Sequence, residues 1–334
     1  MDKTKVRCRT FMVFPCIWMK WKHCSVAERT VRGCSVSFIM ISIKKLIMSM
    51  IMPDRLQALL EHFSVKAKVF RTGALCGIND ADGEGDAGYL HVIRNGKVEV
   101  GHERAGILRI TQPSLLLYPR PLPHRFITDR EQGADTTCAR LSFDGGAANP
   151  IAMAMPEFIC LPLSELEGAE GVLRLLFEEA FSQYCGRQAM LDRLFEVLLI
   201  QVLRHLMENG QTRGGMLAGL AHLRLRAALV AMHEQPARDW SLDALAECAG
   251  MSRSVFANAF RETVGCTPGS YLQRWRIGIA QKSLRQGRTL KLIAGDVGYG
   301  SEAALSRAFK AQSGLSPGQW RSAHKLAKET NGAA

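Results

Sequence analysis

A repeated pattern near the C-terminus constrains the fold of this chain more than any other feature. The segments "MSRSVFANAFRETVGCTPGSYLQRWR" (251–276) and "YGSEAALSRAFKAQSGLSPGQWR" (299–321) match in order. The matched pairs are Ser252 with Ser301, Ala259 with Ala308, Phe260 with Phe309, Gly265 with Gly314, Pro268 with Pro317, and Gly269 with Gly318. A helical unit that occurs twice is typical either of an all-helical packing core or of a paired binding module.

The first copy predicts a helix, a tight turn and a second helix. Ser241 is a suitable cap for a helix that ends at Gly250, where the turn needs a residue free to take positive φ. Ser252 starts the next helix. Its predicted buried face holds Val255, Phe256, Ala259 and Phe260, and its free face holds Arg253, Ser254, Ala257, Asn258 and Arg261. This arrangement is typical of a helix-turn-helix whose second helix offers a polar surface to a partner.

The second copy predicts the same arrangement. Leu290, Ile293, Ala294 and Val297 occupy the packing positions of its first helix, and Ala304, Leu305, Ala308 and Phe309 those of its second. The outward positions of the second helix are Glu302, Ala303, Ser306, Arg307 and Lys310. A single helix over 268–287 is predicted between the copies. A rigid helix there would fix the spacing of the two units, as two successive major grooves of DNA require.

Charge is distributed unevenly along the 334 residues. Residues 1–52 hold ten basic and two acidic side chains, a net of +8, and residues 220–334 hold 16 and eight, again +8. The segment 53–219 has 17 basic and 21 acidic side chains, a net of −4. A basic C-terminal domain fits a polyanionic partner, whereas the simpler alternative is a solvated surface. The turn glycines and free polar faces favour nucleic acid.

The front half predicts a small antiparallel barrel or jelly roll followed by helices. A short amphipathic helix over 53–63 precedes short alternating segments, and Asn95-Gly96 is a strong hairpin signal. From about 168 the pattern becomes helical, and the second helix of this part carries a wide apolar stripe. The stripe consists of Leu191, Leu194, Phe195, Leu198, Leu199, Val202, Leu203 and Leu206. It is wider than one small barrel needs, so it packs on the barrel, forms a dimer contact, or does both.

The barrel shows no pattern of catalytic or metal-ligating residues. A metal-dependent jelly roll would carry a His-x-His, a nearby Glu and a later His, but His91, His102 and His124 are isolated in the sequence. The acidic, Gly-rich segment 77–88 lacks the spacing of an EF-hand and predicts a flexible surface loop. The ten cysteines show no CxxC and no zinc spacing, which indicates a reducing cytosol. We therefore predict a non-enzyme with no cofactor and no metal.

Residues 1–52 differ in composition from the rest of the chain. The apolar run 38–52 is interrupted by Lys44 and Lys45 and is shorter than the roughly 20 apolar residues of a membrane span. Met48, Met50 and Met52 precede a convincing helix start, so an upstream start that is not native is the preferred interpretation. A membrane or interfacial anchor is the alternative.

The paired units resemble the helix-turn-helix module of AraC/XylS-type transcription regulators. The resemblance is carried by "LAECAGMSRSVFANAFRETVGCTPGSYLQRWRIGIA" and "IAGDVGYGSEAALSRAFKAQSGLSPGQWR" and covers about 100 residues. "PDRLQALLEHF", "TGALCG" and "LHVIRNGKVEV" resemble, more weakly, the cupin-like sensor domain of one AraC subfamily. The resemblance implies a sensor barrel, dimerising helices, and binding of double-stranded promoter DNA that recruits or blocks RNA polymerase.

By position in this motif, the DNA-contacting residues fall on both units. In the first they are Ser252, Arg253, Ser254, Ala257, Asn258 and Arg261, and in the second Ser301, Glu302, Ala303, Ser306, Arg307 and Lys310. Arg253, Arg261 and Lys310 are expected to touch phosphate, which positions a protein without reading bases. Ala257 could meet only a thymine methyl. Asn258 replaces a common longer basic residue, Leu305 an aromatic and Trp320 a tyrosine, so the first unit is expected to read fewer bases than the second.

The complete prediction is an α+β chain with a cupin-like antiparallel barrel, C-terminal helices, and an all-α domain of two helix-turn-helix units joined by a linker helix. The predicted segments are 1–52 (non-native extension), 53–165 (sensor barrel), 166–210 (dimerising helices), 211–222 (linker), 223–326 (DNA-binding domain) and 327–334 (disordered tail). We expect a cytoplasmic homodimer whose unidentified small-molecule effector lies near His91, Tyr118, Arg120 and His124. A cupin-type enzyme with a DNA-binding tail and a membrane-tethered regulator are the alternatives.

Overall fold

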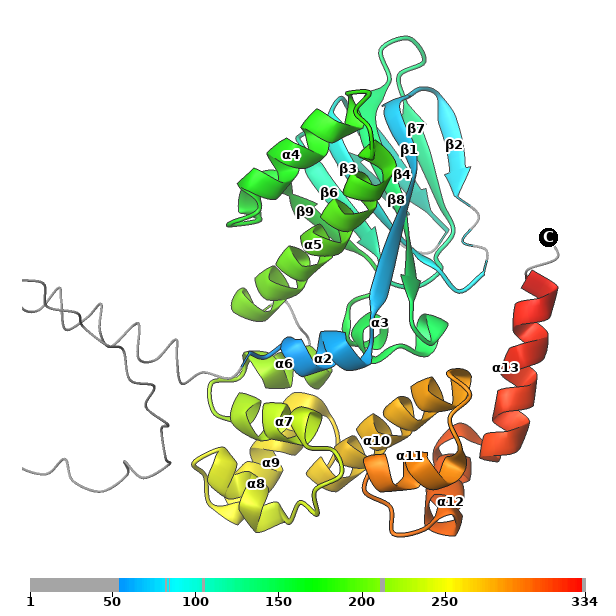
Figure 1. The fold of residues 1–334 in the computed structure, drawn as a ribbon. Coiled ribbons are helices and arrows are strands. Elements are labelled where there is room, and N and C mark those ends of the chain that lie inside the picture. The colour runs from blue at the N-terminus through cyan, green and yellow to red at the C-terminus, as the bar shows by residue number, and fades with distance from the viewer. Residues whose placement is uncertain (1–53, 82, 84, 104–105, 211–213, 332–334) are drawn as a thin grey trace, which may run out of the picture. The chain divides into compact units, whose positions relative to one another are not determined.

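The computed structural model describes residues 54–331, except 82, 84, 104–105 and 211–213. The interpretation of residues 1–52 therefore lies outside the described residues. In the described part, the predicted fold class is confirmed: an antiparallel β domain precedes a helical domain, as Figure 1 shows.

The β domain consists of two antiparallel sheets. The five-stranded sheet has the order β1 (Val65–Leu75), β8 (Ala134–Phe143), β3 (Gly88–Asn95), β6 (Ser114–Tyr118) and β9 (Ile159–Pro162). The four-stranded sheet has the order β2 (Ile78–Ala81), β7 (His124–Thr128), β4 (Val98–His102) and β5 (Gly106–Ile110). The predicted hairpin turn lies between β3 and β4, where Gly96 has φ +98°. Strand β2 corrects the expectation of a loop at 77–88, because Ile78–Ala81 pairs with β7.

The five-stranded sheet is buried on both faces. Alternate residues of β3 and β6 face opposite sides, as strand geometry requires. Leu90, Val92, Leu115 and Leu117 join the helical core, whereas Ile93, Leu116 and Tyr118 join a second cluster with Val100 and Phe126 of the other sheet. The second cluster fills the inside of the barrel, where His91, Tyr118 and His124 of the candidate effector residues lie.

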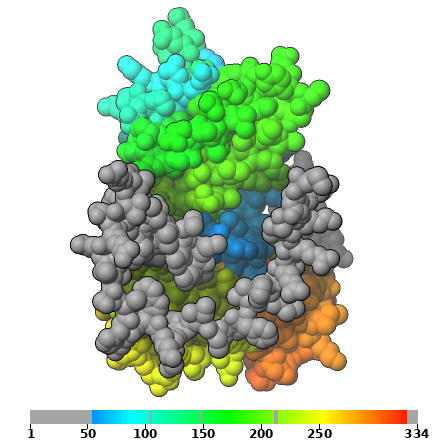
Figure 2. Space-filling model, turned by 60° about the vertical axis from the view of Figure 1, so that its left-hand side comes forward, coloured from blue at the N-terminus to red at the C-terminus, as the bar shows by residue number. Residues whose placement is uncertain are grey.

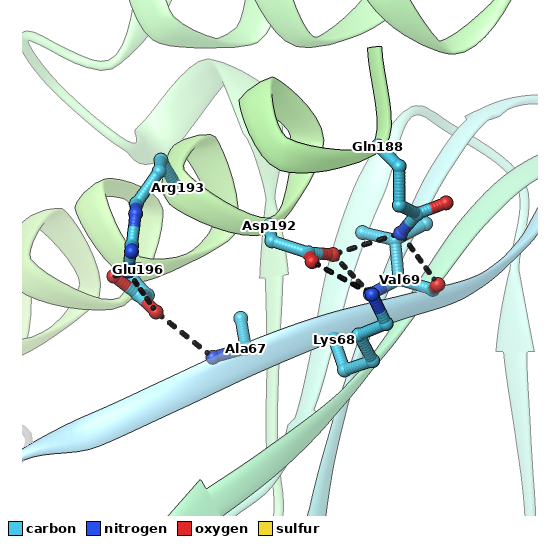
Figure 3. Close-up of polar contacts among 7 residues, drawn as sticks. All are labelled: Ala67, Lys68, Val69, Gln188, Asp192, Arg193 and Glu196. Atoms are coloured by element: carbon cyan, nitrogen blue, oxygen red, sulfur yellow. Dashed lines mark hydrogen bonds and ion pairs between the residues drawn. The ribbon is translucent and has the colours of Figure 1, made fainter. Parts of the chain in front are cut away.

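Helices α4 (Glu170–Ala180) and α5 (Arg187–Glu208) lie against the five-stranded sheet (Figure 1). The predicted apolar stripe of α5 is buried. Strand β1 is an edge strand, and side chains of α5 bond backbone groups of its residues Ala67 and Val69 (Figure 3). Asp192 accepts from the Val69 amide at 2.7 Å, Gln188 donates to the Val69 carbonyl at 2.9 Å, and Glu196 accepts from the Ala67 amide at 3.3 Å. This edge is thus blocked against pairing with another strand.

Short helices connect the barrel to the helical domain. They are α2 (Gln57–His62), α3 (Pro150–Ala154), α6 (Gly215–Ala221) and α7 (Leu225–Glu234), with 3-10 turns at Gly146–Ala148 and Leu163–Glu165. Helix α6 lies in the segment 211–222 that the sequence predicted as a linker, and it buries Leu217 and Leu220. The linker therefore contains an ordered helix.

The remaining helices form the two repeated units and the helix between them. They are α8 (Leu242–Cys248), α9 (Arg253–Val264), α10 (Pro268–Arg285), α11 (Leu290–Asp296), α12 (Glu302–Ser313) and α13 (Pro317–Asn331). Helix α13 continues through most of the predicted disordered tail. Among the described residues no single helix is long and apolar enough to span a bilayer, although the bent pair α6 and α7 passes a length and composition test.

Candidate nucleic-acid interface and effector pocket

The first unit has the predicted helix-turn-helix geometry. The Ser241 hydroxyl accepts a hydrogen bond from the Ala244 amide at 3.1 Å and caps α8. Gly250 turns the chain with φ +61°, and α9 follows. The predicted contact residues Ser252, Arg253, Ser254, Asn258 and Arg261 are exposed, and Ala257 is half-buried. Helix α9 thus presents these side chains at its surface.

Val255 is a correction to the predicted buried face of α9. Its side chain is 51% exposed, whereas Phe256 and Phe260 are fully buried. The reason is the helical period of 3.6 residues: a face centred on Phe256 and Phe260 leaves the position just before Phe256 at its margin. Val255 is therefore an exposed apolar side chain beside Ser254 on the same helix.

The second unit repeats this geometry with different side chains. The Ser301 hydroxyl accepts from the Ala304 amide at 3.2 Å and caps α12. Glu302, Ala303, Arg307 and Lys310 are exposed, and Ser306 is half-buried. Among the described residues, neither Arg307 nor Lys310 has an ion-pair partner. Both cations are thus available to an external anion.

Arg276 of α10 holds the two units together, a role that the sequence analysis missed. Its guanidinium donates to the carbonyls of Pro236 at 2.7 Å and Arg238 at 2.8 Å, which precede α8. It also donates to the carbonyl of Gly298 at 3.4 Å, in the turn of the second unit. Gly298 has φ +78°, and a Cβ there would lie 2.5 Å from the Ala237 carbonyl oxygen. The turn of the second unit therefore packs directly on the loop before the first.

Three of the four predicted effector residues come together inside the barrel. His91 and His124 approach each other with 3.2 Å between their Nε2 atoms, and the rings of Tyr118 and His124 stack at 4.0 Å. These histidines are isolated in the sequence, but antiparallel pairing brings residues that are far apart in the chain together. Arg120 lies elsewhere: its guanidinium donates to the carbonyls of Ala152 and Met155.

His102 is a member of this cluster that the sequence analysis did not select. It stands opposite His124 in the β4–β7 register, and its Nε2 lies 2.8 Å from the Tyr118 hydroxyl. Phe158 stacks on its ring at 4.8 Å. The alternation in β4 predicts that His102 shares a face with Val98 and Val100, but which strand lies opposite can be read only from the fold.

The cluster is electrically neutral near neutral pH. Burial lowers the pKa of His124 to about 4, lowers the pKa of His91 well below its ordinary value, and also lowers that of His102. Burial raises the pKa of Tyr118. The His124 Nδ1 donates to the Leu122 carbonyl at 2.8 Å, so its Nε2 carries the lone pair that faces His91. Within the part of the chain that the structure describes, the buried Nδ1 of His91 has no hydrogen-bond partner.

A cavity of about 470 Å³ opens onto this cluster. His102 and His124 belong to its wall together with Asp80 and Arg125. These two form an ion pair with 2.5 Å between Arg125 Nε and Asp80 Oδ1. Among the described residues, no group of three or more His, Cys, Asp or Glu side chains is placed to hold a metal ion. The size of the cavity and its polar groups suit a small organic molecule.

The fold therefore combines an antiparallel β-barrel with two helix-turn-helix units, each of which exposes the polar face of its second helix. The cupin family model matches residues 54–208, and the helix-turn-helix domain model matches residues 245–323. The chain thus combines an N-terminal cupin domain with an AraC-type helix-turn-helix domain.

Several proteins and one solved structure are similar to parts of this chain. A Streptomyces lividans protein named as an AraC-like transcription regulator is 38% identical over 54% of this chain and 60% of its own length. The Escherichia coli transcriptional activator RclR is 28% identical over 70% of this chain and 86% of its own length. The DNA-binding domain of AdpA, solved with target DNA, is 29% identical with a TM-score of 0.29, covering 30% of this chain and 93% of that domain. The chain matches about three-fifths of the Streptomyces protein and not its whole length.

Proposed function

We propose that this protein is a sequence-specific DNA-binding transcription regulator of the AraC type whose activity responds to a small molecule bound in the barrel. The observation that carries the proposal is the pair of helices α9 and α12, which present exposed polar side chains and whose two units are held in one arrangement by Arg276. Helix α10 has 18 residues and is about 27 Å long at 1.5 Å per residue. A rigid helix between the two units keeps their spacing fixed, as binding to successive major grooves on one face of DNA requires.

The test is selection of bound sequences from a library of random duplexes by the full chain. A recurring motif with two short conserved blocks, about one helical turn apart, is expected. Binding that is diffuse and falls steeply with salt, without any motif, would contradict sequence-specific regulation and would leave only phosphate attraction.

The effector site that we propose is the barrel interior. Its neutral imidazoles and the Tyr118 hydroxyl favour an uncharged or weakly polar molecule with hydrogen-bonding groups, because they offer hydrogen bonds but no charge, and the Arg125 guanidinium in the cavity wall is already paired with Asp80. A thermal-shift screen of small metabolites should yield a stabilising compound, and His124→Phe should abolish its effect. A compound that stabilises both variants equally would place the effector elsewhere.

We further propose that the protein acts in the cytoplasm as a homodimer that contacts RNA polymerase. Support for a dimer comes from apolar side chains that α4 and α5 leave exposed, namely Leu175, Phe181, Met190 and Val197. The surface of these helices is visible in green in Figure 2. Light scattering on the purified chain should give twice the monomer mass. The Val197→Glu variant should have the mass of one monomer.

A further inference from the structure

The two helix-turn-helix units touch each other directly, in addition to being joined through α10. Helix α10 sets the distance between the units, and the short segments 265–267 and 286–289 connect it to α9 and α11. A rigid helix between two bodies does not by itself fix how they are turned about its axis. The orientation of one unit relative to the other therefore depends on the contacts that the units make beside this helix.

The first side of the direct contact is the loop 236–240, which precedes α8. Trp240 Nε1 donates to the Gln235 carbonyl at 3.0 Å, and the Arg238 amide donates to the same carbonyl at 3.2 Å. The Arg238 guanidinium lies over the Trp240 ring, 4.1 Å from its centroid. Ser241, which follows the loop, caps α8. The loop is thus ordered by its own bonds and continues directly into the first unit.

The second side of the contact is the turn between α11 and α12. The amides of Gly298 and Tyr299 donate to the carbonyls of Gly295 at 3.1 Å and Ala294 at 2.8 Å, which fixes the turn to α11. A Cβ on Gly298 would lie between 2.5 and 2.9 Å from three backbone atoms of Ala237. No side chain fits in that space, so the backbone of the second unit packs directly on the loop of the first.

Arg276 bonds both sides of the contact from the middle of α10. Its Nε and Nη2 donate to the loop carbonyls of Pro236 and Arg238, and its Nη1 donates to the carbonyl of Gly298. The Tyr299 ring lies 5.7 Å from the guanidinium. A guanidinium is planar and its N–H groups point in fixed directions, so the carbonyls that it bonds are held in fixed relative positions. Arg276 therefore ties the orientation of the second unit to that of the first.

We propose that Arg276 is a positioning residue that sets how many base pairs separate the two halves of the DNA site. The inference rests on the proposed DNA-binding function. One additional base pair moves a sequence block by about 3.4 Å along the duplex and turns it by about 35° around the duplex axis. Two units held in one orientation cannot follow this change, so either α9 or α12 loses its base contacts. Units free to turn about α10 would follow it.

Competition binding of the full chain to duplexes that differ only in spacing tests this proposal. The wild type should bind its selected duplex at least about 10-fold more tightly than duplexes with one base pair added or removed between the two blocks, because each mismatched base costs about 5- to 150-fold in affinity. Arg276→Gln loses the guanidinium and cannot bond all three carbonyls. This variant should reduce the ratio between the spacings to less than about 3-fold.

A second variant and two matched controls separate orientation from charge and from backbone strain. Gly298→Ala keeps Arg276 but pushes the turn away from the loop, so it should also reduce the ratio. Its control is Gly314→Ala, because Gly314 likewise has a positive φ, +76°, but has open space around it in the described part of the chain. Arg274→Gln is the control for charge: it removes an exposed guanidinium of α10 that contacts only Cys266. Both controls should keep the wild-type ratio.

The ratio between the spacings distinguishes the outcomes. A lower ratio in both variants, with both controls at the wild-type value, supports the proposal. A merely structural role would weaken binding at every spacing alike, so a loss of equal size at all spacings, or of all binding, in Arg276→Gln overturns it. If circular dichroism shows that this variant does not fold, Gly298→Ala decides by the same criterion. A wild type that ignores spacing also overturns the proposal, whereas a wild type that selects no motif refutes the proposed function itself.

Discussion

The two helix-turn-helix units share one fold but differ in their attachment and in their exposed side chains. The first is joined to the rest of the chain by apolar packing: α6 lies against α7 and α9, and a Cβ on Gly219 would meet Leu229 at 2.4 Å and Val264 at 2.9 Å. The second is attached through Arg276, the Gly298 turn and Arg285. Duplication therefore preserved the packing positions, whereas attachment and surface diverged.

The side chains at the outward positions of α9 and α12 also differ between the two units. Helix α9 offers Val255, Ala257 and Asn258 where α12 offers Ala304, Ser306 and Arg307. Arginine can form two hydrogen bonds to one guanine, whereas valine and alanine can only touch a thymine methyl. We therefore expect the second unit to contribute more to sequence reading than the first.

Truncation of core side chains should have the largest effect on the difference in attachment between the two units. Phe260→Ala and Phe309→Ala each remove a fully buried ring and should each cost about 3–5 kcal/mol of stability. Hydrogen exchange should show that the first change loosens α6, α7 and α9 together, because they share a core. The second should loosen α11–α13 alone. Equal loosening of both regions by both variants would contradict the difference in attachment.

Acid should weaken the barrel and the first unit before the second. His124 and His233 are buried with pKa values lowered by burial to about 4 and about 3, and His233 stacks on Trp275 at 3.8 Å. Below about pH 6.5 these histidines take up protons in the unfolded chain, whereas in the folded chain they stay neutral because their pKa values are lower. Stability should therefore fall by about 1.4 kcal/mol per pH unit for each histidine until its folded pKa is reached.

Urea unfolding between about pH 7 and pH 5 measures this slope. His233→Gln should reduce it by the share of one histidine. No histidine among the described residues 289–324 is fully buried, so the second unit serves as the internal reference. A free energy of unfolding that does not change between about pH 7 and pH 5 would contradict the burial of these histidines in their neutral form.

Substitutions of base-contacting residues should show a smaller difference between the two units. Arg307→Ala should cost about 1–3 kcal/mol at one base position, and Asn258→Ala less, in competition binding to duplexes that differ at single positions. Lys310→Ala is the control, since removing a phosphate-binding side chain from α12 should weaken binding to all duplexes alike. If Arg307→Ala also weakens all duplexes equally, Arg307 contacts only phosphate.

The smallest expected effect concerns Val255. Val255→Ser removes an exposed apolar side chain and should lower affinity by less than about 1 kcal/mol, only for duplexes with thymine at the contacted position. Val255→Thr keeps one methyl group and is the matched control. Equal affinities of the two variants for thymine-containing and thymine-free duplexes would remove Val255 from the interface.

Local patterns in the sequence predicted the helices, the turn glycine Gly250, the serine cap of α8, and the general order of strands and helices. These features depend on neighbours a few residues apart, so spacing and side-chain type suffice to indicate them. The predicted DNA-contacting positions follow from the same period, and the one misplaced residue, Val255, lies at the margin of the buried face.

Only the tertiary structure brought His91, His102 and His124 into one cluster, gave Arg276 three carbonyl partners, and placed Asp144 beside Arg285. The partners in these contacts lie between 22 and 141 positions apart in the chain. Strand register and helix packing determine such contacts, and both arise from the burial of the whole apolar surface at once. The sequence alone therefore determined the two units, and the fold decided how they are connected to the barrel.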